Sequence, residues 1–267
     1  MLLTDAIRLQ AGDALACVGA GGKTTTCWRL WAETRARGWR PVFTTTTRIL
    51  EPVLPDDSAL LLSNNPRPAR MRQAICEVGG LILAASRLPE AVNDALPNPI
   101  APALPSKLAG LQSERLDRLI EALPEMTWLV EADGARGRGL KLPAAREPVI
   151  PARTTLVAVL MHMDVIGHPL DEVVAHRPEA LAAYLGLPMG HPIAAGHISR
   201  LLVDPAAGLK AVPAGARVVA VLNQRDESAP RPETRQVAWA ALASGRYERV
   251  LSASLQARRP VLEVFIR

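Results

Sequence analysis

Aromatic side chains are scarce in this sequence, where phenylalanine, tryptophan and tyrosine make up 3% of the 267 residues. Proteins that bind single-stranded nucleic acids stack the bases on such side chains, so the scarcity argues against that class of partner. The net charge of +5 is not evidence for a nucleic-acid partner, because a phosphate ligand or a general bias towards arginine explains the charge equally well. We expect no nucleic-acid partner.

Cysteine is also rare. The three cysteines, Cys17, Cys27 and Cys76, lie far apart and have none of the paired spacings that zinc and iron–sulfur sites require. This excludes a metal site built from thiolates, and we expect the three side chains to be buried thiols.

Long hydrophobic runs are missing as well. No run approaches the roughly 20 apolar residues that span a bilayer, and residues 1–5 lack the basic region and the apolar stretch of a signal peptide. We therefore expect no membrane partner and a cytoplasmic location.

What the sequence does contain is a hydrophobic content of 49% and short apolar runs that alternate with helical patterns. This alternation predicts an α/β fold with three layers, a mostly parallel sheet flanked by helices. We expect one P-loop NTPase-like domain over residues 1–267, with a loop-rich insertion around 86–112. The predicted strands are 14–18, 41–45, 60–62, 81–84, 127–131, 155–160, 217–223, 249–251 and 261–266.

A glycine-rich turn between the first strand and a helix over 24–37 carries the strongest motif. Its glycines let backbone N–H groups point towards phosphate oxygens, and the start of the helix favours negative charge. The lysine would neutralise the β- and γ-phosphates of ATP or GTP, and the first threonine would ligate Mg²⁺. The full Walker pattern has a glycine where this chain has Cys17, so the loop is a shortened one; a turn without a ligand is the alternative. The predicted nucleotide-binding residues are Gly19, Ala20, Gly21, Gly22, Lys23, Thr24 and Thr25.

Two acidic residues, Glu131 and Asp133, follow a buried strand and lie on the same side of the chain because side chains alternate along a strand. We predict that they hold Mg²⁺ together with Thr24, and that Lys23, Glu131 and Asp133 are the catalytic residues. A solvated strand end is the alternative.

Polar residues elsewhere are candidate substrate contacts. A run of hydroxyls ends the second predicted strand, on the side where open parallel sheets bind ligands. A basic segment with flanking glycines follows the acidic pair and would gate the phosphate site; a surface loop without a ligand is equally compatible with it. The candidates are Thr45, Thr46, Arg48, Arg136, Arg138, Lys141, His176 and Arg177.

The strand at 217–223 ends in Asn223, Gln224, Arg225 and Asp226, which is close to the Asn-Lys-x-Asp by which GTPases read guanine. Asp226 would accept hydrogen bonds from N–H groups that adenine does not offer in that arrangement. Gln224 stands in place of the lysine that covers the base. An ordinary turn is the alternative, and the choice between ATP and GTP stays open.

Together these motifs resemble the YqeC family, which is described as accessory proteins of selenium-dependent molybdenum hydroxylases. The resemblance implies a role in maturing a selenium-containing molybdenum cofactor or its host enzyme, and it makes that hydroxylase or cofactor the expected partner. The order of loop, acid and basic segment is also similar to dethiobiotin synthetase, whose strand-end glutamate serves the metal, and this suggests Glu131. The segments that carry the resemblance are 18–25, 44–47, 131–135, 141–144, 147–151, 176–179 and 222–226.

Three hypotheses follow. The first is a Mg²⁺-dependent NTP hydrolase or phosphoryl-activating maturation factor. The second is an ATP-dependent ligase that activates a small anionic substrate held by Arg136, Arg138 and Lys141. The third is a nucleotide-gated module that delivers a cofactor without hydrolysis.

Overall fold

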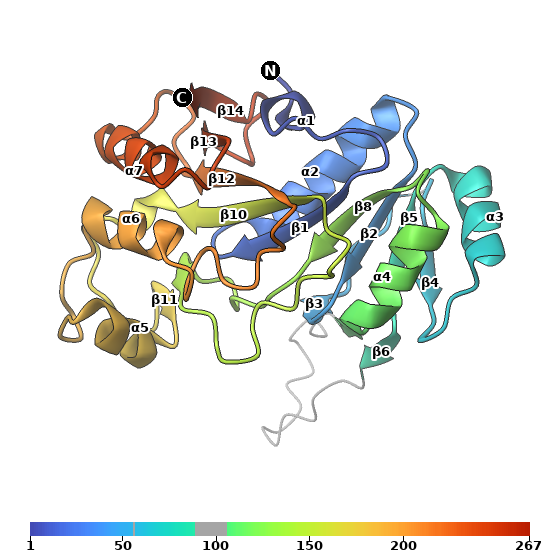
Figure 1. Ribbon diagram of the computed structural model, residues 1–267, viewed down its shortest axis with the longest axis horizontal. Coiled ribbons are helices and arrows are strands. Elements are labelled where there is room, and N and C mark those ends of the chain that lie inside the picture. The colour runs from blue at the N-terminus through green and yellow to red at the C-terminus, as the bar shows by residue number, and fades with distance from the viewer. Residues whose placement is uncertain (56, 89–105) are drawn as a thin grey trace, which may run out of the picture.

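The computed structural model describes residues 1–55, 57–88 and 106–267, and it shows an α/β fold with one large sheet flanked by helices (Figure 1). The sheet has nine strands in the order β14-β13-β12-β10-β1-β8-β2-β5-β4. All neighbouring strands are parallel except β13 and β14, which are antiparallel. The strands are β1 (Ala14–Gly19), β2 (Pro41–Thr45), β4 (Ala59–Leu62), β5 (Leu81–Ala84), β8 (Thr127–Glu131), β10 (Leu156–His162), β12 (Arg217–Asn223), β13 (Arg249–Ala253) and β14 (Val261–Ile266).

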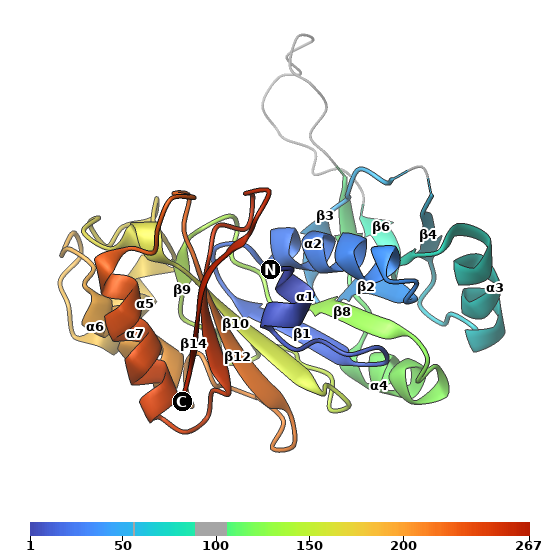
Figure 2. The same ribbon diagram turned by 90° about the horizontal axis from the view of Figure 1, so that it is seen from above.

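Helices cover both faces of this sheet because its strands are apolar on both sides. Alternate residues of β1 belong to different cores: Ala14, Ala16 and Val18 pack with α3 to α7, whereas Leu15 and Cys17 pack with α1 and α2. Figure 2 shows α2 and α4 on opposite sides of the sheet. The helices are α1 (Leu3–Ala6), α2 (Lys23–Ala36), α3 (Pro68–Val78), α4 (Ser113–Ala122), α5 (Pro178–Leu185), α6 (Ala195–Val203), α7 (Pro232–Ala243) and the 3₁₀ helix η1 (Met163–Val165).

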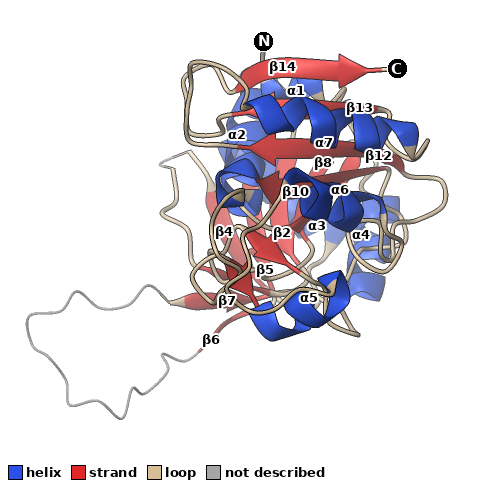
Figure 3. Cartoon of the chain, turned by 90° about the vertical axis from the view of Figure 1, so that its left-hand side faces the viewer, coloured by secondary structure: helices blue, strands red, loops and turns tan. Residues whose placement is uncertain are grey.

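All nine predicted strands are present and together form the large sheet, although some bounds differ. β10 extends to His162 and β13 to Ala253, two residues beyond the predicted ends. β14 forms one edge of the sheet (Figure 3), and both chain termini lie beside it (Figures 1 and 3). The prediction for cysteine was partly wrong: Cys17 and Cys27 are buried, but Cys76 is exposed.

Five short strands were not predicted. β3 (Arg48–Leu50), β7 (Lys107–Ala109) and β6 (Ser86–Leu88) form a small antiparallel sheet, and β9 (Leu140–Lys141) pairs with β11 (Ala175–His176). The expected insertion at 86–112 begins with β6 and ends with β7 and the approach to α4; its central part, 89–105, lies outside the described residues. No helix among the described residues combines the length and apolar character needed to cross a bilayer.

Strand order determines where a ligand can bind. β8 and β2 lie on one side of β1 in the sheet, and β10, which follows β8 in the large sheet along the chain, lies on the other side. In open parallel sheets such a reversal opens a crevice at the carboxyl ends of the strands, and ligands bind there. Here the crevice is at the end of β1.

Candidate functional site

The glycine-rich loop follows β1 and leads into α2 at Lys23. Gly19 and Gly21 have φ values of +90° and +85°, in the left-handed region that side chains disfavour. A Cβ atom at Gly19 would lie 2.3 Å from the carbonyl oxygen of Leu160, and one at Gly21 would lie 2.5 Å from the Cβ atom of His162. The loop therefore needs glycine at both positions to pack against the end of β10.

Backbone N–H groups at the start of α2 are available for a ligand. The N–H of Gly19 donates to Asp133 at 3.0 Å and that of Ala20 to Leu160 at 2.9 Å. Within the described part of the chain, the N–H groups of residues 21–25 have no hydrogen-bond partner. Five consecutive free donors at the start of a fourteen-residue helix form a site suited to an anion.

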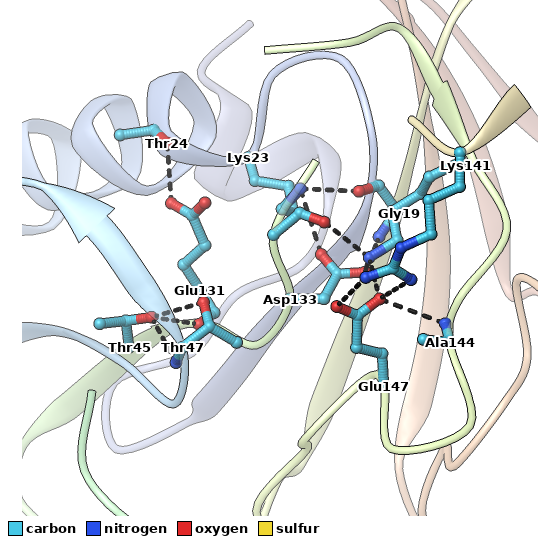
Figure 4. A network of polar contacts seen from close by, with 12 residues as sticks. Gly19, Lys23, Thr24, Thr45, Thr47, Glu131, Asp133, Lys141, Ala144 and Glu147 are labelled. Atoms are coloured by element: carbon cyan, nitrogen blue, oxygen red, sulfur yellow. Dashed lines mark hydrogen bonds and ion pairs between the residues drawn. The ribbon is translucent and has the colours of Figure 1, made fainter. Parts of the chain in front are cut away.

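Lys23 lies beneath these donors and is 4% exposed. Its Nζ atom donates to the carbonyl oxygen of Gly19 at 2.7 Å and lies 3.1 Å from Oδ1 of Asp133 (Figure 4). The structure therefore brings Lys23 together with Asp133, an ion pair that was not predicted from the sequence. The ammonium group is held against the loop by one carbonyl and one carboxylate.

Thr24 and Glu131 are in direct contact. The hydroxyl of Thr24 donates to Oε2 of Glu131 at 2.7 Å. Burial raises the pKa of Glu131, and the positive charge of Lys23 and the hydrogen bond from Thr24 only partly oppose this rise. A buried carboxyl group of this kind gains most from a cation, because a cation compensates the cost of burying its charge.

Asp133 connects the loop to the segment that follows β8. Its side chain is 2% exposed and accepts a hydrogen bond from the N–H of Gly19. It pairs with Lys23 through Oδ1 and with Lys141 through Oδ2, each at 3.1 Å (Figure 4). One carboxylate thus lies between two buried ammonium groups.

The network continues beyond Asp133. Lys141 is 3% exposed, and its Nζ atom donates to the carbonyl oxygen of Gly134 at 2.7 Å and to Glu147 at 2.9 Å. Arg177, directly before α5, reaches Glu147 at 3.3 Å. Burial alone would raise the pKa of Glu147, but the hydrogen bond and charge of Lys141, with help from Ala144 and Arg177, lower it to about 2.

The predicted substrate contacts lie in different surroundings. Thr45 is buried, and its hydroxyl donates to the carbonyl oxygen of Glu131 at 2.8 Å. The hydroxyl of Thr46 donates to Val149 at 2.7 Å. Both threonines thus fasten the end of β2 to β8 and to the segment beyond it. Arg48 is exposed in β3.

The basic candidates also separate into two groups. Arg136 is exposed and Arg138 is half-buried, where it donates to the carbonyl oxygen of Val173 at 3.3 Å, whereas Lys141 is inside the ion network. His176 is partly buried in β11, and its pKa is lowered by burial and by the nearby cations Arg177, Lys141 and Arg136.

Asn223 lies against the loop, whereas Asp226 faces solvent. Nδ2 of Asn223 donates to the carbonyl oxygen of Gly21 at 2.8 Å, and Oδ1 accepts from the N–H of Leu255 at 3.1 Å. This side chain therefore joins the glycine loop to the segment after β13. Asp226 is exposed and accepts from the N–H and hydroxyl of Ser228. Gln224 is buried, and its amide holds the turn through the carbonyl oxygens of Asp226 and Ala229.

Sequence reasoning missed the role of Glu147. The residue lies in a segment of the YqeC-like pattern, but its partnership with Lys141 and Arg177 arises only when β9 and β11 come together. The available signal was that Glu147 follows Lys141 by six positions in the sequence. No group of three or more histidine, cysteine, aspartate or glutamate side chains in the described ranges could hold a metal.

The depressed pKa of Glu147 makes stability depend on pH. A carboxyl group with a lowered pKa in the folded state stabilises the fold above its unfolded pKa, about 4.3, and loses that contribution as pH falls towards about 2. We expect Glu147→Gln to lower the free energy of unfolding at pH 7 and the difference from the unchanged chain to shrink below about pH 4.3. Urea unfolding from pH 7 to pH 3 measures this.

Glu172→Gln is the matched control, because Glu172 is exposed and has no ion-pair partner among the described residues. It should change stability little at any of these pH values. A pH-independent difference for Glu147→Gln would contradict an ionic role for this carboxylate.

Comparison with known proteins agrees with the resemblance seen in the motifs. The family model described as YqeC protein matches residues 15–179, which include the glycine loop, Glu131, Asp133, Lys141, Glu147 and Arg177. A curated relative, the uncharacterized protein YqeC of Escherichia coli (strain K12), is 28% identical over 216 residues, covering 79% of this chain and 75% of the relative. No solved structure matches the chain. The match over more than half of its length shows that the chain belongs to the YqeC family.

Proposed function

We propose that this protein is a Mg²⁺-dependent, nucleoside-triphosphate-binding protein of the P-loop class, acting as a single domain over residues 1–267. The observation that carries the proposal is the row of free N–H groups at residues 21–25, with Lys23 beneath it and the contact between Thr24 and Glu131 beside it. A polyphosphate supplies the negative charge and the acceptors that these donors lack. ATP and GTP are both candidates.

Lys23 and Asp133 have linked roles in this proposal. The Asp133 carboxylate accepts a hydrogen bond from the Gly19 N–H and pairs with the Lys23 ammonium group. A phosphate group would compete with Asp133 for Lys23, while Lys141 would keep Asp133 paired. Lys23 would then stabilise charge on the transferring phosphate, and Asp133 would orient water or substrate.

The residues at the end of β8 suit Mg²⁺. This ion is normally held by one or two carboxylates together with phosphate oxygens and water, not by an all-protein cage. Glu131, buried and in contact with the Thr24 hydroxyl, provides such a carboxylate, and Asp133 is a second candidate. Bound Mg²⁺ would neutralise negative charge on the phosphates.

The two segments that follow β12 and β13 are candidates for the base. Asn223 joins the glycine loop to Leu255, so these segments border the phosphate site. Asp226 is exposed and would read guanine if GTP is the ligand.

Membership of the YqeC family supports a role as an accessory protein in maturing a selenium-dependent molybdenum hydroxylase or its cofactor. The residues that would contact the substrate or partner are Arg48, Arg136, Arg138, His176 and Arg177. Thr45 and Thr46, whose hydroxyls are bonded to backbone carbonyl oxygens, would position the end of β2. The burial of Lys141 between Asp133 and Glu147 favours a positioning role for this residue over direct contact with an acceptor.

Two alternatives make different expectations about turnover. A ligase consumes nucleotide only when its anionic acceptor is present, whereas a nucleotide-gated delivery module binds nucleotide and turns it over slowly or not at all. Phosphate release measured with and without the partner hydroxylase separates these from a hydrolase with intrinsic turnover.

Replacing Lys23 with alanine tests the phosphate site. We expect Lys23→Ala to weaken binding of ATP or GTP at least tenfold, because it removes the ammonium group that faces the phosphates. Isothermal titration calorimetry with each nucleotide and Mg²⁺ measures the affinity. Lys107→Ala removes an exposed lysine of β7 and should bind like the unchanged chain. Equal affinity in the Lys23 variant would defeat the proposal.

A second substitution tests the metal role of Glu131. Mg²⁺ should tighten nucleotide binding in the unchanged chain and have at most a small effect in Glu131→Gln, since an amide cannot supply the negative charge. Because burial raises the pKa of Glu131, the benefit of Mg²⁺ should also diminish as pH falls. The measurement is nucleotide affinity with and without Mg²⁺, with Glu121→Gln at an exposed position of α4 as control. A benefit that survives unchanged in Glu131→Gln would remove this residue from the metal site.

A further inference from the structure

A groove lined by arginines lies at the carboxyl edge of the sheet, away from the glycine loop. It consists of two hollows of about 460 Å³ and about 430 Å³ that share Asn65. The first contains Asn64, Arg115 and Arg118, and the second contains Arg67 and Arg70. Among the residues that the structure describes, no aspartate or glutamate lines either hollow, so the groove concentrates positive charge.

The arginines of this groove are not neutralised by the protein. In the described part of the chain none of the four forms an ion pair within 4.0 Å, whereas Arg72 on the same helix as Arg70 pairs with Glu125 at 2.7 Å. Nε of Arg115 is buried and has no hydrogen-bond partner. Only Nε of Arg118 is engaged, with the carbonyl oxygen of Glu114 at 3.3 Å. Guanidinium groups left in this way favour phosphate, which they bind in bidentate fashion.

The backbone adds donors to each hollow. α3 begins at Pro68 beside the second hollow, and α4 begins at Ser113 beside the first; neither helix has a side-chain cap. Arg72 also donates to the carbonyl oxygen of Ala122, which links α3 to the end of α4. Each hollow thus combines two arginines with the uncapped start of a helix, an arrangement that binds phosphate.

The groove is distinct from the nucleotide site but belongs to the same edge. The N–H groups of Gly110 and Leu111, which line the first hollow, donate to the carbonyl oxygens of Thr47 and Thr45. Asn64 follows β4, four positions from β1 in the sheet. At about 4.8 Å per strand, the groove extends from about 10 Å to about 19 Å from β1. The phosphate tail of a nucleotide at the loop does not fill it.

We infer that this groove binds a second ligand, a small molecule that carries a diphosphate group. Its binding is independent of the nucleotide. Its use as the substrate on which the nucleotide acts rests on the proposed function.

Inorganic pyrophosphate is the probe, and the full chain with Lys23→Ala is the starting protein, so that the glycine loop does not contribute. Calorimetry should detect pyrophosphate binding to this chain. Adding Arg115→Ala and Arg118→Ala should weaken it at least tenfold. Adding Arg40→Ala and Arg235→Ala instead removes the same charge at exposed positions outside the groove and should change it less than twofold. Arg118→Glu alone provides an exposed charge reversal should the double variant not fold.

Three results would overturn the inference: no pyrophosphate binding to the Lys23→Ala chain, unchanged binding after loss of Arg115 and Arg118, or an equal loss in the control. ATP binding to a chain that carries only the two groove substitutions should equal that of the unchanged chain. The nucleotide proposal fails separately, when Lys23→Ala leaves ATP and GTP binding intact.

Discussion

The buried ion pair between Lys23 and Asp133 is the interaction on which the site depends. Both side chains are almost fully buried, and a buried charge that loses its partner costs several kcal/mol. Asp133 meets this constraint with one hydrogen-bond donor, the Gly19 N–H, and two ion-pair partners, Lys23 and Lys141. The end of β1, the start of α2 and the segment after β8 are therefore held in one arrangement by one carboxylate.

This constraint extends to the helices on the other side of β1. Lys141 forms an ion pair with Glu147, and Glu147 forms another with Arg177 at the start of α5. Lys23, Lys141 and Arg177 carry three positive charges against the two negative charges of Asp133 and Glu147. Glu131 lies outside this set, and its carboxyl group accepts a hydrogen bond from the Thr24 hydroxyl. A network with this balance accepts a phosphate more readily than a neutral one does, and a change at Lys23 alters the surroundings of each later member.

The sequence predicts long elements well, but it does not predict short elements whose partners lie far away along the chain. Strands buried on both faces read as short apolar runs, so all nine strands of the large sheet were found, including β2 and β8 with their bounds. The small strands β3, β6, β7, β9 and β11 have two or three residues. This is too short for the alternation of apolar and polar residues that marks a strand to be recognised. Their pairing depends on segments that meet only in three dimensions.

The same distinction applies to the site. Lys23, Thr24, Glu131 and Asp133 follow directly from a motif or a strand end, and parallel strands bring their carboxyl ends together by geometry alone. The environment of each side chain was beyond the sequence. Lys141 and Arg136 occupy one short basic segment, yet Lys141 is buried between two carboxylates and Arg136 is exposed. Lys141 lies in β9, which is buried and pairs with β11, whereas Arg136 precedes this strand.

The arginine groove could not be predicted from the sequence, since its residues come from two separate segments, 61–73 and 110–118, and neither segment carries a recognisable motif.

The distance of the groove from the glycine loop limits how a ligand in the groove could react. A phosphate held at Arg67 or Arg70 lies near β4, about 19 Å from β1 by strand spacing, too far for direct contact with a phosphoryl group at Lys23. A ligand bound there must place its reactive end towards β2, where Thr45 and Thr47 meet Gly110 and Leu111. There the Thr45 hydroxyl donates to the backbone carbonyl oxygen of Glu131. The strand-end threonines thus connect the proposed arginine groove to the strand that carries Glu131.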